Sequence, residues 1–253
     1  MDPAQISALL EPFLERPLSA AQLNQTSMYI DLLLRWNARI NLTAVRKPEE
    51  IVTRHFGESF FLARHLFPDR PDRALLAAPE AVPESSIGSS LTTNHSPLAP
   101  AVVDIGSGAG FPALPLKIWA PDLRLTLVES NHKKAAFLRE AIRALTLMDV
   151  DVIAERAETI ALRQTPLPPA DLQTPFRADL VTLRAVEKSD QIIPVAASFL
   201  APHGRLALLI SSPQLEKLRS LPSMNAIKWM SIPIPQSHSR VLTIAVHRQS
   251  GNL

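Results

Sequence analysis

The fold of this chain is constrained most by three glycines within five residues, Gly106, Gly108 and Gly110. The whole chain has only seven glycines, so this cluster indicates a backbone that needs positive φ angles or the close approach of a ligand. A short apolar run at 101–105 precedes the cluster, and a helical pattern at 111–120 follows it. Strand, glycine turn and helix form the first unit of a nucleotide-binding α/β fold, in which the ligand lies beyond the carboxyl end of the strand.

The spacing of the glycines distinguishes two classes of ligand. Dinucleotide-binding proteins use the pattern G-x-G-x-x-G, and Phe111 stands here at the position of its third glycine. The observed pattern D-x-G-x-G-x-G, which starts at Asp104, resembles motif I of the S-adenosylmethionine-dependent methyltransferases. A second strand pattern at 124–128 ends in Glu129, whose carboxylate can accept hydrogen bonds from both hydroxyls of a ribose. A structural strand-turn-helix without a ligand is the alternative that this pattern leaves open.

The composition excludes several kinds of chemistry and only weakly suggests a partner. The chain has no cysteine, which excludes disulfides, thiolate metal sites and a cysteine nucleophile. Its formal net charge is +2, and residues 101–253 hold 17 basic against 13 acidic residues. This surplus is compatible with a polyanionic substrate but does not require one.

The sequence predicts a soluble protein of the cytoplasm. The first four residues lack the basic start of a signal peptide, and no apolar run approaches the length of a membrane span. No set of metal-ligand side chains stands out, so we expect no metal. No heptad pattern indicates an oligomer, so a monomer is the default expectation.

The N-terminal part of the chain predicts helices without a nucleotide-binding motif. Apolar residues at 6–14 follow helical spacing, and S-A-A-Q at 19–22 is a capping box that opens a second helix, which runs to about Trp36. Pro-Glu-Glu at 48–50 starts a third helix, which we expect to continue to about Phe67.

A change in composition divides the chain into three segments. Residues 74–100 are rich in Pro, Ala and Ser and show little hydrophobic periodicity, which is typical of a flexible linker or insertion. We therefore predict a helical extension at 1–73, this insertion at 74–100 and a ligand-binding catalytic domain at 101–248. A second insertion-like stretch lies at 165–175.

From residue 101 onwards strand and helix patterns alternate, which predicts an α/β domain with a mostly parallel sheet of seven strands. Together with the glycine turn, this alternation is typical of a Rossmann-like fold of the class I methyltransferase type. Further strands are expected at 150–154, 179–183, 205–210, 227–234 and 241–247, further helices at 131–145 and 192–200, and a turn at 202–204.

Four matches in the sequence, the last made of two short elements, together indicate a specific family. Residues 34–43 resemble a "WNxxxNLT" element, and residues 55–59 resemble "HxxDS". Residues 104–112 carry Phe-Pro directly after the glycines, which is unusual among methyltransferases in general. Residues 155–158 and 183–185 resemble "xRxE" and "SRA" elements. These elements are similar to those of the bacterial 16S ribosomal RNA guanine-N7 methyltransferases, once named glucose-inhibited division protein B.

The resemblance implies a cofactor, a partner and a set of site residues. The cofactor would be S-adenosylmethionine, and the partner would be 16S ribosomal RNA or the small ribosomal subunit. The implied cofactor contacts are Gly106, Phe111, Ala157, Glu158 and Arg184, while Asp104, Gly108 and Glu129 match general motif positions. Arg184 would lie where the methyl donor meets its acceptor, and we predict a positioning role for it.

The chemistry that the resemblance implies needs no general base. Guanine N7 carries a lone pair and no proton, so positioning the two reactants provides most of the catalysis. Enzymes that methylate exocyclic amines often carry Asn/Asp-Pro-Pro-aromatic after the fourth strand, and residues 183–186 do not fit that pattern. His132, Arg139 and Arg143 share one polar helix face, which is either a solvated surface or a contact with RNA phosphates.

Two other functions stay open at this point. One is a methyltransferase that acts on a small molecule or a protein, which would need neither the helical extension nor the basic helix face. The other is a non-catalytic RNA- or nucleotide-binding relative that no longer binds the cofactor. A nicotinamide-dependent oxidoreductase is disfavoured, because Phe111 interrupts the dinucleotide pattern.

Overall fold

The structure, a computed structural model, describes residues 1–68, 99–163, 177–184, 189–220 and 229–246. The predicted insertion at 74–100 lies outside the described residues except for its last two, and the stretch at 165–175 lies outside them entirely.

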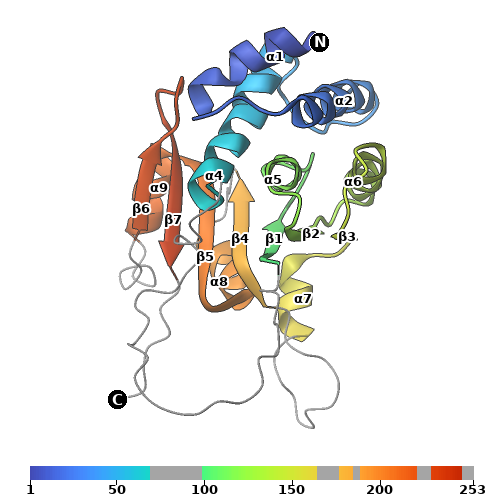
Figure 1. The fold of residues 1–253 in the computed structure, drawn as a ribbon. Coiled ribbons are helices and arrows are strands. Elements are labelled where there is room, and N and C mark those ends of the chain that lie inside the picture. Colours follow the sequence, from blue (N-terminus) through green and yellow to red (C-terminus); the bar gives the residue numbers. More distant parts are fainter. Residues whose placement is uncertain (69–98, 164–176, 185–188, 221–228, 247–253) are drawn as a thin grey trace, which may run out of the picture.

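The described residues form one seven-stranded sheet with the strand order β3-β2-β1-β4-β5-β7-β6 (Figure 1). Strands β1 to β5 pair in parallel, and β7 runs antiparallel to both β5 and β6. The sheet confirms the predicted α/β, Rossmann-like class with a mostly parallel sheet. The strands are β1 Ala101–Ile105, β2 Arg124–Val128, β3 Val150–Ile153, β4 Ala178–Arg184, β5 Leu200–Ser211, β6 Trp229–Pro233 and β7 Arg240–Val246.

Helices cover both faces of the sheet, because successive strand residues point to opposite sides. Val102 belongs to one hydrophobic cluster with the helices α5 and α6, whereas its neighbour Val103 belongs to a second cluster with α7, α8 and α9. Burial on both faces explains why these strands are continuous apolar runs. The helices are α5 Ala113–Trp119, α6 His132–Ala144, α7 Ala157–Arg163, α8 Ser189–Ser198 and α9 Ser212–Arg219.

The order of the strands reverses at β1, which pairs with β2 on one side and with β4 on the other. In the β1–β4 register Asp104 lies opposite Thr182, and Arg184 is the last residue of β4. Ligands of open α/β sheets bind outside the carboxyl ends of the strands at such a point. The fold therefore places Asp104, the glycine turn and Arg184 at the same edge of the sheet.

The N-terminal helices gather at the end of the sheet toward which β4 runs (Figure 1). The predicted capping box is present, with the Ser19 hydroxyl accepting from the Gln22 amide and the Gln22 side chain accepting from the Ser19 amide. Gln22 also donates to the carbonyls of Ile118 and Trp119, so α2 is bonded to the end of α5. The elements are α1 Pro3–Leu10, the 3₁₀ turn η1 Glu11–Phe13, α2 Ala20–Asn37, α3 Pro48–Ile51, the π-helical turn η2 Val52–Gly57 and α4 Glu58–Leu66.

The third predicted helix, at 48–67, is present but is not uniform. Its middle turn, η2, is π-helical, and such wide turns occur frequently at functional sites. A Cβ added at Gly57 would lie 2.7 Å from the ring of Phe13, so glycine lets η1 pack against this turn. The hydrophobic pattern at 48–67 could not show the widened turn, because residues 55–63 are all buried and no exposed face marks the change of helical phase.

One expectation for the C-terminal half is wrong, and one helix was missed. The turn predicted at 202–204 is part of β5, whose pairing with β4 shifts between Leu200 and Arg205. The residues between these two, 201–204, stay within the strand, and His203 has a φ of 64°. Helix α9 was not predicted, although its capping box between Ser211 and Gln214 has a sequence signature.

The N-terminal helices and the sheet share one hydrophobic core, since residues from α1, α2, α4, α5 and α6 belong to the same buried cluster. The predicted boundaries of the three segments, at residues 73 and 100, stay a prediction. Within the described part of the chain, no helix is both long enough and apolar enough to cross a membrane.

Candidate functional site

The glycine turn connects β1 to α5 and is bonded to the end of β2. Gly106, Gly108 and Gly110 have φ angles of 70°, 56° and 82°, in the left-handed region that favours glycine. The amides of Gly106 and Ser107 both donate to the carbonyl of Val128, at 2.8 and 3.1 Å, and the Gly110 amide donates to the Ser107 carbonyl at 2.7 Å. The turn is therefore fixed to the neighbouring strand and within itself.

The three glycines serve different purposes. A Cβ added at Gly106 would meet no atom of the described residues within 4 Å, so the backbone there faces open space that a ligand can enter. A Cβ at Gly108 would make only ordinary contact, 3.8 Å from the Gly106 oxygen. At Gly110, however, a Cβ would lie 2.4 Å from the hydroxyl of Tyr29 and 2.7 Å from Leu114. Gly106 therefore suits ligand approach, whereas Gly110 is required by packing.

Glu129, at the end of β2, faces the glycine turn, and its contact with a ribose stays a prediction. One carboxylate oxygen accepts from the Gly108 amide and the other from the Asn131 amide, both at 2.8 Å. These two bonds fix the carboxylate, which is 7% exposed. Each oxygen keeps a second acceptor site, so the group can still bind two hydroxyls.

Asp104 is buried beside the turn and has one free acceptor atom. Its Oδ1 accepts from the Thr182 hydroxyl at 2.6 Å, and its Oδ2 has no hydrogen-bond partner among the described residues. Burial raises the pKa of the Asp104 carboxyl from 3.8 to about 7, although the hydrogen bond from Thr182 favours the charged form. A buried acceptor without a partner is unfavourable unless a ligand donates to it.

Arg184, at the end of β4, is held by the π-helical turn of the N-terminal helices. Its guanidinium donates to the His55 Nδ1 at 2.7 Å, to the Arg54 carbonyl at 2.5 Å and to the Glu58 carboxylate at 3.0 Å. From the sequence, an ion pair with Glu158 or Glu187 is the structural alternative to a role of Arg184 in turnover. In the described structure the ionic partner is Glu58, and Glu187 lies outside the described residues.

The carboxylate of Glu58 lies between two guanidinium groups. Its second oxygen is 2.7 Å from the Nε of Arg240, at the start of β7. The Glu58 side chain is 3% exposed, while those of Arg184 and Arg240 are 12% and 17% exposed. Burial lowers the pKa of Arg184 to about 10, and Glu58 opposes that shift. Arg184 therefore stays charged at neutral pH.

His55 is a neutral imidazole with both ring nitrogens engaged. Because Arg184 donates to the Nδ1, the ring proton must lie on the Nε2, which is 2.7 Å from the Thr43 hydroxyl. Burial, with a contribution from the Arg184 charge, lowers the pKa of His55 to about 2. Its ring stacks on that of Phe111, with centroids 4.9 Å apart. His55 thus connects Arg184 to the glycine turn.

The remaining predicted cofactor contacts lie at the start of α7, after β3. Ala157 is buried among the residues that cover one face of the sheet, and Glu158 is exposed in the first turn of the helix. Because β3 pairs in parallel with β2, this helix start lies at the same edge of the sheet as Glu129. The contacts of Ala157 and Glu158 with a cofactor stay predictions.

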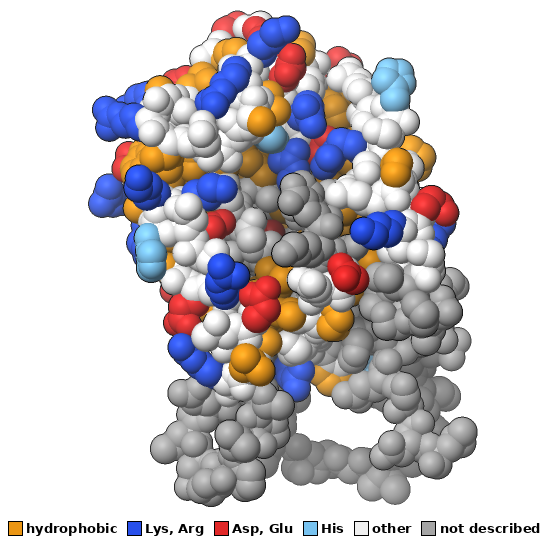
Figure 2. Space-filling model, turned by 180° about the vertical axis from the view of Figure 1, so that it is seen from behind, with side chains coloured by type: hydrophobic (Ala, Val, Ile, Leu, Met, Phe, Trp, Pro, Cys, Tyr) orange, Lys and Arg blue, Asp and Glu red, His pale blue; other side chains and the backbone are white. Residues whose placement is uncertain are grey.

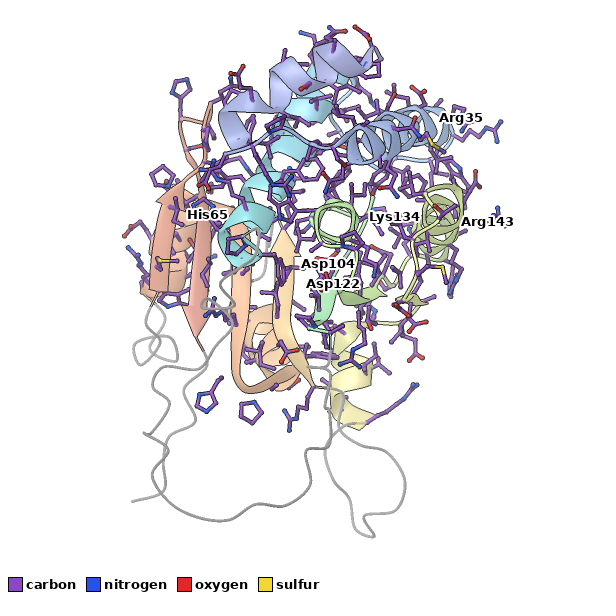
Figure 3. All side chains as sticks on the ribbon, in the orientation of Figure 1. Arg35, His65, Asp104, Asp122, Lys134 and Arg143 are labelled. Carbon is purple, nitrogen blue, oxygen red and sulfur yellow. The ribbon has the colours of Figure 1, made fainter. Side chains whose placement is uncertain are left out.

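The predicted RNA contacts lie along α6, from His132, three residues after Glu129, to Arg143 near the other end of the helix. His132, Arg139 and Arg143 are exposed, and Arg139 donates to the Val152 carbonyl at 3.2 Å. Figure 3 shows Arg143 at the periphery of the molecule and Asp104 near its centre. Figure 2 shows basic side chains spread over one face and interleaved with acidic ones. A role for α6 in binding RNA stays a prediction.

Sequence reasoning missed the partners of Arg184. His55 and Glu58 lie in the element at 55–59 that resembles the family, but Glu58 and Arg184 are 126 positions apart. A single sequence carries no signal for such a contact. Within the described ranges, no three side chains of the His, Cys, Asp and Glu types come together as a metal site would require.

Comparison with known proteins identifies the family. The sequence model of the family described as "rRNA small subunit methyltransferase G" matches residues 22–75 and 82–242. The chain belongs to this family. It is 38% identical over 190 residues to the Ribosomal RNA small subunit methyltransferase G of Chloroflexus aggregans, and this match covers 75% of the chain and 64% of that protein. It is 32% identical over 246 residues to the protein of the same name from Stenotrophomonas maltophilia, and this match covers 96% of both.

The family predicted from the four sequence matches is thus confirmed. Among solved structures, the chain is similar to an rRNA methylase from Streptococcus thermophilus, with a TM-score of 0.45 and 15% identity over 60% of this chain and 89% of that one.

Replacing Gly106 should abolish cofactor binding. A valine side chain would project into the open space beside the turn and would also strain a backbone with a φ of 70°. Calorimetric titration with S-adenosylhomocysteine should detect no binding to Gly106→Val and weakened binding to Gly106→Ala. Unchanged affinity of a folded Gly106→Val variant would reject the placement of the ligand at this turn.

Replacing Asp104 should change how stability depends on pH. The native state holds the Asp104 proton more tightly than the unfolded chain, so this group stabilises the fold at low pH and loses its contribution as the pH rises from 3.8 to about 7. Asp104→Asn removes this titration. As the pH rises from 3.8 to about 7, the free energy of unfolding of the variant should increase relative to that of the wild type by on the order of 4 kcal/mol.

Urea unfolding at a series of pH values, without ligand, measures this difference. If the curves for Asp104→Asn and the wild type run parallel, the Asp104 carboxyl does not titrate in this window.

Proposed function

We propose that this protein transfers a methyl group from S-adenosylmethionine to N7 of a guanine in 16S ribosomal RNA of the small ribosomal subunit. One observation carries the proposal. The backbone of the glycine turn faces open space at Gly106, and the turn adjoins the unpartnered Oδ2 of Asp104 and the fixed carboxylate of Glu129, in a chain of the rRNA small subunit methyltransferase G family.

The residues around the turn fit S-adenosylmethionine, which supplies an electrophilic methyl group on its sulfonium. The fixed carboxylate of Glu129 has acceptor sites left for the ribose hydroxyls. The unpartnered Oδ2 of Asp104 suits a buried donor such as the ammonium of the methionine end. The backbone at Gly106, with the neighbouring Gly108 and Phe111, would line the same ligand.

The other cofactor contacts in this proposal lie after β3 and β4. Ala157 and Glu158 would receive the adenine, because the start of α7 lies at the same sheet edge as Glu129. Arg184 would face the reaction centre from the end of β4. A single guanidinium with five donors can keep its contacts to the helices and still donate to a ligand.

The arrangement supports methylation without a general base. Guanine N7 has no proton to remove, so the protein has to orient the base rather than activate it. His55 is not free to act as a base, since its Nδ1 accepts from Arg184 and its Nε2 faces Thr43. Arg184 keeps its proton at neutral pH, with a pKa of about 10. Both residues therefore serve to position other groups.

We also propose that RNA contacts the exposed face of α6 through His132, Arg139 and Arg143. Helix α6 starts directly after Glu129, so an RNA strand on this face would lie next to the proposed cofactor site. The proposal includes action in the cytoplasm, as a monomer and without a metal ion.

The proposed function is tested on ribosomal RNA itself. The purified protein, S-adenosylmethionine and either free 16S ribosomal RNA or small subunits from cells that lack the protein should yield N7-methylguanosine at one site, located by mass mapping. Methyl transfer only to proteins or small molecules would replace the proposed substrate. Failure to bind S-adenosylmethionine would instead favour a non-catalytic relative.

Replacing Arg184 should impair turnover without unfolding the protein. Arg184→Ala should lower single-turnover methylation of ribosomal RNA by at least about tenfold, equivalent to about 1.4 kcal/mol. The fold should persist because Glu58 keeps Arg240 as its ionic partner. Arg184→Lys should rescue poorly, because an ammonium cannot reproduce the planar fork that reaches three acceptors.

A matched control for Arg184 is Arg177, which precedes β4 at the opposite end of the strand and donates to the carbonyls of Ser198 and Leu200. Arg177→Ala should leave the single-turnover rate close to that of the wild type. Near-normal turnover in Arg184→Ala, or a loss of activity that unfolding explains, would leave Arg184 with a structural role.

A further inference from the structure

Tyr29, the only tyrosine of the chain, binds the glycine turn from the N-terminal helices. It lies in the middle of α2 and is fully buried. Its hydroxyl donates to the carbonyl of Ala109 at 2.5 Å, across 80 positions of sequence. Burial raises the pKa of Tyr29 well above its usual value, so the hydroxyl stays a donor at any working pH.

The hydroxyl of Tyr29 fits the turn only because residue 110 is a glycine. A Cβ at Gly110 would lie 2.4 Å from the phenolic oxygen, and the φ of 82° there also favours glycine. The amide of Gly110 donates back within the turn to the Ser107 carbonyl. The peptide between Ala109 and Gly110 is thus bonded to α2 on its carbonyl side and to the turn on its amide side.

The ring of Tyr29 fixes the next residue of the turn as well. It stacks on Phe111 with centroids 5.3 Å apart and planes 7° from parallel. His55 stacks on Phe111 at 4.9 Å, and Phe56 meets it edge-on at 5.0 Å. Aromatic pairs at such distances contribute beyond their buried area, so they restrict the orientation of Phe111.

The turn is therefore fixed from two directions. The sheet holds it through the Val128 carbonyl and the Glu129 carboxylate, and the N-terminal helices hold it through Tyr29. We propose that Tyr29 is a positioning residue for the cofactor: its hydroxyl and ring hold residues 109–111 in the conformation that presents the turn to S-adenosylmethionine. This inference rests on the proposed function, because it names a residue that shapes the same site without touching the ligand.

The test removes the hydroxyl alone. Tyr29→Phe keeps the ring and its stacking but leaves the Ala109 carbonyl without its buried donor. The matched control is Thr26→Val, since Thr26 is fully buried on the same helix and donates its hydroxyl to the Gln22 carbonyl at 2.8 Å. Three quantities are measured for both variants and the wild type: the melting temperature, the calorimetric Kd for S-adenosylhomocysteine and the exchange rate of the Gly110 amide in the free protein.

We expect Tyr29→Phe to weaken S-adenosylhomocysteine binding by about fivefold or more, comparable to the loss of roughly one hydrogen bond. The Gly110 amide should also exchange about tenfold faster, because the turn is released on one side. Thr26→Val should leave both quantities close to the wild type at a similar melting temperature.

Unchanged affinity and exchange in a folded Tyr29→Phe protein, or equal effects of the two variants, would overturn the inference. If the wild type itself fails to bind S-adenosylhomocysteine, the proposed function fails, and the exchange rate of Gly110 still decides whether Tyr29 holds the turn.

Discussion

The arrangement of the site depends on one buried carboxylate, that of Glu58. It joins the start of α4 to two strands of the sheet, through Arg184 at the end of β4 and Arg240 at the start of β7. A buried carboxylate is unfavourable unless charges and hydrogen-bond donors match it, so the two guanidinium groups stabilise α4 in this position. Because β4 and β7 flank β5, the two arginines reach the same edge of the sheet. The pairing places the π-helical turn, with the Arg54 carbonyl and His55, against Arg184.

The site is therefore built from two parts of the chain that are far apart in sequence. The sheet contributes Asp104, the glycine turn and Glu129, and the N-terminal helices contribute the residues that hold Arg184 and Phe111 in place. A neutral His55 connects the two parts, because it accepts a hydrogen bond from Arg184 and also stacks on Phe111. A protonated imidazole could not accept from Arg184, since its Nδ1 would carry a proton and its charge would repel the guanidinium. The helices thus define the geometry of the site even though they carry no nucleotide-binding motif.

The sequence predicted the sheet and the turn well because both depend on local patterns. The strands at 101–105 and 124–128 agree with β1 and β2, and the capping box at Ser19 marks the start of α2 correctly. The predictions failed where the pairing of distant residues decides the outcome. Glu58 could not be assigned to Arg184 from one sequence. The residues near His203 have the local pattern of a turn, but they continue β5 between Leu200 and Arg205, which both pair with β4. The ligand contacts at Ala157 and Glu158 stay predictions.

The role of Gly110 has a consequence for how glycine motifs of this kind are interpreted. The first glycine of the motif faces open space, whereas the third gives room to a phenol on α2. The two positions are therefore under different evolutionary constraints, although they are usually counted as one ligand signature. In a related chain without a tyrosine at the position of Tyr29 and with a smaller side chain at the position of Leu114, residue 110 would need only a left-handed backbone, which Asn or Asp can also adopt. Covariation between positions 29 and 110, rather than conservation of the motif as a whole, would mark chains whose N-terminal helices dock on this turn.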